Sequence, residues 1–238
     1  MVKLASRGRR GRCSHGRIVS QLNRETCDEE WDHLWAQSDA WERVVSNETD
    51  LLSEESDHSW DLIQRAGKIA ADDPAASFQL YLEAAEGGSA WSMVQVGWNY
   101  WTGTGVAADP DMALKYYHRA ISAGSWMATL YYARLLAELG HHDDCESTLN
   151  GGLASGFVPA YFWLGYLRYA RSKTSLARRE VRPLMEHAAD EGHPMAKLVL
   201  ARWMALGHFG LHNIPRGWVS VVRLAVTHAF AEKRAAPA

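Results

Sequence analysis

The sequence predicts an all-α fold, a solenoid of about four helix pairs stacked along one axis. Three observations carry this prediction: four similar strings recur along the 238 residues, small residues recur at fixed offsets from them, and Asp-Pro pairs mark helix starts. The strings end at Gly88, Gly124, Gly156 and Gly192, with spacings of 36, 32 and 36 residues. Such a period is typical of one supersecondary unit whose apolar face is buried only by stacking on its neighbours.

Each repeat carries small residues where two helices are expected to cross closely. The clearest of these positions lies nine residues after each repeat glycine. In every repeat a bulky residue precedes this position and a large aromatic or cationic residue follows it. The small residues at this offset are Gly97, Ala133, Gly165 and Ala201. A small side chain beside a larger one indicates close helix contact, so two compact helices are expected in each repeat.

Helix starts are predicted at Asp73-Pro74 and Asp109-Pro110, where an aspartate cap precedes a proline in the first turn. The sequence 213–215, Asn-Ile-Pro, is a looser copy and predicts a terminal helix that completes the array. Pro183 lies inside the helix expected over 178–190, which predicts either a late helix start or a kink.

The segment from Gly97 to Gly124 resembles the Sel-one-like repeat, a relative of the tetratricopeptide repeat. The residues that carry the resemblance are Gly97, Tyr100, Gly103, Gly105, Val106, Asp109, Ala113, Tyr116, Tyr117, Ala120, Ile121 and Gly124. It extends more weakly over about residues 73–232 and implies a right-handed α-α superhelix. It also implies a non-catalytic adaptor or scaffold for protein-protein interaction, and it brings no catalytic residue with it.

Charge divides the chain into three expected regions. Residues 1–24 carry seven basic side chains and no acid, which is typical of a disordered basic tail. Residues 25–57 form an acidic, Trp-bearing amphipathic helix and linker, and residues 58–238 form the solenoid. The net charge of -3 indicates no general attraction to nucleic acid, and no specific nucleic-acid partner is predicted.

The acidic region places Trp31, Leu34, Trp35, Trp41 and Val45 on one face of a helix whose other face is acidic. Three interpretations follow from this pattern. The segment caps the N-terminal end of the solenoid, occupies the solenoid's groove as an internal plug, or binds a separate protein.

A partner-binding groove is predicted from the offset ten residues after each glycine, which in tetratricopeptide geometry faces the concave side. Trp98 and Tyr166 are the predicted anchors there, because Trp, Tyr and Arg dominate interface energies. The alternative interpretation is that these aromatic residues pack between helices. The full predicted groove comprises Trp91, Trp98, Trp101, Met127, Arg134, Phe162, Tyr166, Tyr169 and Arg202.

The C-terminal helix expected over 214–231 is apolar on most of its circumference, although terminal solenoid helices usually have a polar outer side. A second surface is therefore predicted at Trp218, Val222 and Phe230. It favours either a dimer contact or docking at a membrane periphery, and the latter makes a membrane-peripheral assembly factor the alternative function. The oligomeric state stays open.

Catalysis and metal binding are not predicted. Sequence 141–145, His-His-Asp-Asp-Cys, has metal-ligating residue types, but neighbours on a turn rarely converge on one ion, and an aspartate here is expected to cap the next helix. The chain contains neither a nucleophile elbow nor a phosphate loop. Three cysteines and the lack of a secretory signal favour a cytoplasmic location for the protein. The alternative is the periphery of a membrane, on its cytoplasmic side. No cofactor is expected.

Overall fold

The computed structural model describes residues 34, 38–39, 41–46, 48–172 and 174–235; the side chains of residue 48 and of 225–235 are outside the description. Every element in this part of the chain is helical, which confirms the all-α prediction. The elements are α2 (Glu48–Ser53), α3 (Asp57–Ile69), α4 (Pro74–Glu86), α5 (Ala90–Thr102), α6 (Pro110–Ser122), α7 (Trp126–Glu138), α8 (His142–Ala154), α9 (Val158–Ser172), α10 (Ser175–Asp190), α11 (Pro194–Ala205), a 3-10 turn (Leu211–Asn213) and α12 (Ile214–Ala235).

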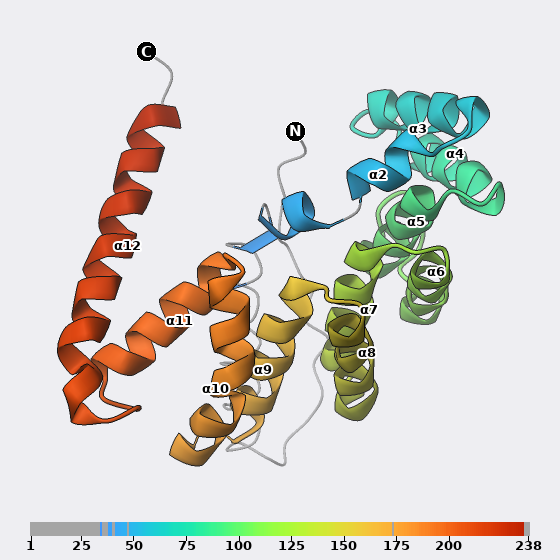
Figure 1. Ribbon diagram of the computed structural model, residues 1–238. Coiled ribbons are helices and arrows are strands. Elements are labelled where there is room, and N and C mark those ends of the chain that lie inside the picture. The colour runs from blue at the N-terminus through green and yellow to red at the C-terminus, as the bar shows by residue number, and fades with distance from the viewer. Residues whose placement is uncertain (1–33, 35–37, 40, 47, 173, 236–238) are drawn as a thin grey trace, which may run out of the picture.

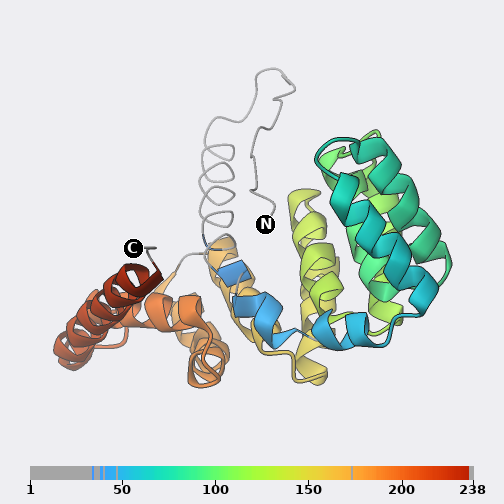
Figure 2. The same cartoon turned by 90° about the horizontal axis from the view of Figure 1, so that it is seen from above.

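The helices from α3 to α12 form a solenoid in which each helix packs on its neighbours in the sequence. Figure 1 shows the stack curving into an open arc, with α3 and α4 at one end and α12 at the other. The view from above in Figure 2 shows the same curvature. We call the inner side of this arc the concave face. There α2 contacts α5, and residues 41–43 contact α7, α9 and the turn before α11.

Local chemistry explains where the helices begin and end. The carboxylates of Asp73 and Asp109 accept hydrogen bonds from the backbone N–H groups of Ala76 and Met112, and a proline follows each, as predicted. The recurring glycines at 88, 124, 156 and 192 all have φ between 74° and 106°. Only glycine adopts this backbone readily, so the repeated string marks the turn after each second helix.

Two local predictions differ from the structure. Helix α10 begins at Ser175, earlier than the predicted start at 178, and continues through Pro183, so the late start is wrong. In the described structure, no aspartate caps α8: His141 precedes the helix without a side-chain capping bond, and the two aspartates lie in the first turn. Acidic side chains stabilise that position through the helix dipole, which is why a cap is dispensable there.

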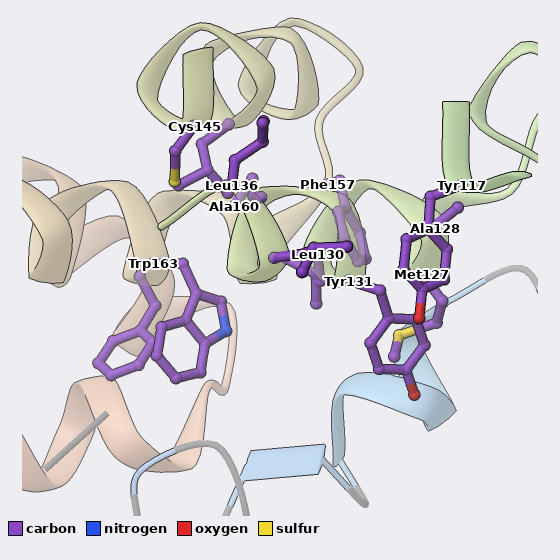
Figure 3. Close-up of a cluster of buried hydrophobic side chains, with 14 of the residues drawn as sticks. Tyr117, Met127, Ala128, Leu130, Tyr131, Leu136, Cys145, Phe157, Ala160 and Trp163 are labelled. Carbon is purple, nitrogen blue, oxygen red and sulfur yellow. The ribbon is translucent and has the colours of Figure 1, made fainter. Parts of the chain in front are cut away.

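The small residues do occupy close crossings. Gly97 of α5 lies against the ring of Tyr117 in α6, Gly165 of α9 lies against Met185 in α10, and Ala133 and Ala201 are buried. Figure 3 shows part of the core that these crossings enclose, with side chains of α6, α7, α8 and α9 interdigitating. Dense packing of this kind makes the concave face a stiff surface.

Candidate interaction surface on the concave face

The described residues 38–39 and 41–46, here called the N-terminal segment, lie on the concave face. They cross the inside of the arc toward α2, which contacts α5. Residues 41–45 are helical, and three consecutive side chains at 41–43 engage α7, α9 and the turn before α11. Of the three interpretations of the acidic region, the internal plug is the one that these positions match. Trp31 and Trp35 lie outside the described residues.

Glu42 is the centre of this contact, and it is fully buried. Its Oε1 accepts a hydrogen bond of 2.7 Å from the indole Nε1–H of Trp163. The same oxygen lies 3.1 Å from Nε2 of His193, which is also fully buried. A carboxylate removed from water requires partners of this kind, because an unpaired buried charge is strongly destabilising.

The tautomer of His193 follows from its second contact. Nδ1 accepts a hydrogen bond of 3.3 Å from the backbone N–H of Ala196 and so caps α11. In the neutral ring the proton is therefore on Nε2, which donates to Glu42. Phe162 stacks on the imidazole at 4.4 Å between centroids and holds the ring in place.

The neighbours of Glu42 complete the contact. Trp41 meets the ring of His193 edge-on at 5.0 Å between centroids and lies beside Gly192. On the other side, Arg43 donates a hydrogen bond of 2.6 Å to the hydroxyl of Tyr131, and Figure 3 shows Tyr131 and Trp163 as separate members of the buried cluster. Three residues of one helical turn thus bridge three repeats.

The predicted groove residues fall into two groups. Trp98, Trp101 and Arg134 come together on α5 and α7: the two indoles pack edge-to-face at 5.4 Å, and the guanidinium lies 5.1 Å above the Trp101 ring. Glu138 joins both helices by accepting from Trp101 at 3.1 Å and from Arg134 at 3.2 Å. All three predicted residues are partly exposed.

The other predicted residues are dispersed. Met127, Phe162 and Tyr166 are at most 2% exposed and belong to the core, which matches the alternative interpretation for those three side chains. Trp91 packs against Tyr81 and is partly buried. Tyr169 packs against Trp203 and Arg178, whereas Arg202 is exposed on α11. Of the four residues that stand ten positions after a repeat glycine, only Trp98 and Arg134 therefore share one surface.

Sequence reasoning missed Tyr131, Trp163 and His193. Tyr131 and Trp163 both stand seven residues after a repeat glycine, so a large aromatic side chain at offset seven was the signal for this surface. His193 directly follows its glycine, at the offset where Ser89 and Ser125 cap α5 and α7. An imidazole in a series of serine caps was the second signal.

Ionisable groups elsewhere serve the packing of the solenoid. Burial raises the pKa of the Cys145 thiol to about 12, which leaves it a protonated, weakly nucleophilic group. Burial, followed by a hydrogen bond to Glu86, raises the pKa of Tyr116 to about 12. Arg119 and Tyr116 both donate to Glu86 and lower the pKa of that carboxyl. Within the described residues, no three His, Cys, Asp or Glu side chains are grouped so that they could hold a metal.

The predicted C-terminal surface is exposed where it is described. Trp218 and Val222 of α12 are 57% and 56% exposed, and Val219 beside them is also exposed. The side chain of Phe230 lies outside the described residues. No helix in the described part of the chain is long and apolar enough to cross a membrane.

Comparisons with known proteins agree with this architecture. Residues 65–89 and 92–125 match the family model of the Sel1 repeat. A Sel1 repeat protein from Oxalobacter formigenes superposes with a TM-score of 0.56 at 17% identity, covering 82% of this chain and 83% of that one. A protective antigen of uropathogenic Escherichia coli with an SLR fold gives 0.55 at 15% identity, covering 70% of this chain and 38% of that one. No curated protein matches the sequence.

Proposed function

We propose that this chain, whose residues 65–125 are Sel1 repeats within an α-solenoid, is a non-catalytic scaffold that binds a protein partner on its concave face. Sel1 repeat proteins are generally protein-interaction scaffolds. One observation supports the proposal that the partner binds on the concave face. The concave face holds a helical segment through side chains from three successive repeats, which is how a helix-binding groove recognises its ligand.

The partner surface that we propose centres on Trp98, Trp101 and Arg134. These side chains are partly exposed, and their mutual contacts fix their orientation. Rigid aromatic and guanidinium groups contribute most to binding because little side-chain entropy is lost when a partner docks. Trp98 also packs against Tyr131, which joins this cluster to the surface that the N-terminal segment covers.

Replacing both Trp98 and Trp101 by alanine is expected to weaken capture of the cellular partner at least tenfold, since one truncated anchor typically costs about 2 kcal/mol. The measurement is quantitative cross-linking and pull-down of the full chain from its native cells. Trp60→Ala is the matched control, because Trp60 is an exposed indole on α3 outside the concave face. Undiminished capture by a helical double variant would contradict the groove proposal.

A second candidate function rests on the exposed apolar side of α12. Trp218, Val219 and Val222 are each more than half exposed there, and interfacial helices present such residues to a bilayer surface. This supports the alternative of a membrane-peripheral assembly factor at the cytoplasmic side. The cytoplasm itself remains our proposal for the location of the scaffold.

Co-flotation with liposomes distinguishes the two candidates. If α12 docks at membranes, the chain floats with vesicles containing anionic lipid, and Trp218→Ser together with Val222→Ser reduces the floated fraction at least fivefold. Leu206→Ser, which alters an exposed residue just after α11, is the control. Absence of the wild-type chain from the floated fraction would eliminate the membrane alternative.

A further inference from the structure

The contact between Glu42 and the solenoid has the properties of a ligand contact. The solenoid is built from helices that pack on their neighbours in the sequence, and the N-terminal segment precedes the first of those pairs, α3 and α4. The bonds that hold Glu42 span 121 and 151 residues of sequence. Pairing within the repeats is thus local in sequence, whereas the contact with Glu42 is long-range.

The two donors that receive Glu42 are oriented by the solenoid itself. His193 is fixed by its capping bond to Ala196 and by the stacked ring of Phe162, so its Nε2–H points into the concave face. Trp163 packs edge-on against Phe162 at 5.0 Å, which sets the direction of its Nε1–H. Such preorganised donors reduce the entropy lost on binding, so a carboxylate gains affinity there.

We propose that Trp163 and His193 form a carboxylate-binding subsite of the concave face, and that the N-terminal segment occupies it as a tethered ligand through Trp41 and Glu42. This inference rests on the proposed scaffold function and names the partner class. The partner presents an acidic helical segment with an aromatic residue beside the acid, as Trp41 and Glu42 do, and it replaces the tethered segment.

The choice of an acidic aromatic helix follows from the pocket's other walls. Trp41 packs edge-on against His193 and lies beside Gly192, where a Cβ atom would be in van der Waals contact with the indole at 3.6 Å. Tyr131 offers its hydroxyl to the cation that follows the acid. A buried carboxylate adds specificity more than stability, because an apolar or basic residue at its place offers no acceptor to the two donors.

Competition by a peptide in trans tests the inference. The probe is a fluorescent peptide with the sequence of residues 34–46. Wild-type chain is expected to show no binding at micromolar peptide, because a tethered ligand acts at an effective concentration of about 1 mM. The full chain with Glu42→Lys, which expels its own segment, is expected to bind the peptide at micromolar concentration.

Two matched variants locate the binding at the subsite. A peptide carrying glutamine in place of Glu42 is expected to bind at least tenfold more weakly, since charge-assisted hydrogen bonds are lost. Adding His193→Asn to the Glu42→Lys chain keeps a capping side chain on α11 and is expected to cause a similar loss. Glu54→Lys, at an exposed position after α2, is the charge-matched control and should leave the wild-type result unchanged.

The outcomes separate this inference from the scaffold function. Failure of the peptide to bind a helical Glu42→Lys chain, or equal binding of both peptides, overturns the subsite. If Glu42→Lys does not fold, Trp41→Ala serves as the release variant, because it leaves no unpaired cation behind. Binding that meets these criteria while no cellular partner is captured would support the subsite and remove the scaffold proposal.

Discussion

Replacing Gly105 by alanine is expected to lower the melting temperature of the chain by about 8–12 °C. Gly105 has φ of +73°, where alanine costs about 1–2 kcal/mol. In addition, a Cβ atom there would lie 2.0 Å from the carbonyl oxygen of Pro74. Backbone atoms cannot rotate away, so the α5–α6 loop must separate from the start of α4. Together the two effects are expected to lower the free energy of unfolding by about 3–4 kcal/mol.

Thermal unfolding followed by circular dichroism at 222 nm is the measurement, and Gly88→Ala is its control. Gly88 also has a positive φ, of 101°, but no atom lies within 4 Å of its would-be Cβ. The control therefore reports the backbone strain alone, about 1–2 kcal/mol. Equal losses in the two variants would show that the contact with Pro74 contributes nothing to stability.

Gly97→Leu is expected to destabilise the chain by about 3 kcal/mol, because it overpacks the crossing of α5 and α6. A Cβ atom at this position would lie 2.7 Å from Cε1 of Tyr117, whose side chain is fully buried. The tyrosine ring cannot yield, since it stacks on Tyr131 at 5.8 Å and meets Trp101 edge-on. The strain should therefore reach Tyr131 and loosen its contact with Arg43.

Urea denaturation measures this loss, with Gly151→Leu as the control on α8. Gly151 is exposed and a Cβ atom there would meet nothing within 4 Å, so leucine gains helix propensity of up to about 1 kcal/mol. The two substitutions should thus change stability in opposite directions. A destabilisation of similar size in both would mean that the crossing tolerates the larger side chain.

The repeats and the helix boundaries could be predicted from the sequence, because each is determined by residues that are close together in the chain. Asp73 caps a helix through an N–H only three residues away, and each repeat glycine ends its helix through its own φ. Pro183 was harder to interpret, because packing on neighbouring helices keeps α10 continuous despite the residue's low helix propensity.

The candidate site was predicted only in part. Trp98 and Arg134 do lie on a shared surface, through Trp101, whereas Tyr166 is buried at the next repeat and Arg202 is exposed without a described contact to them. The rotation of one helix relative to the next decides which offset faces inward. The repeats are not identical: residues 103–109 join α5 to α6, whereas only residues 139–141 join α7 to α8, so one fixed offset does not mark the same face in every repeat.

The sequence by itself determined an all-α array of helix pairs, the aspartate caps of α4 and α6, and the glycine turns, because each depends on residues a few positions apart. Only the tertiary structure decided that Glu42 lies between Trp163 and His193 on the concave face. The repeat offsets mark Trp163 and His193, but no pattern in the chain indicates that Glu42, 121 and 151 residues away, is their partner. The contacts arise when the stacked repeats bring distant donors to one surface, where Oε1 of the buried carboxylate meets two partners and Oε2 meets none.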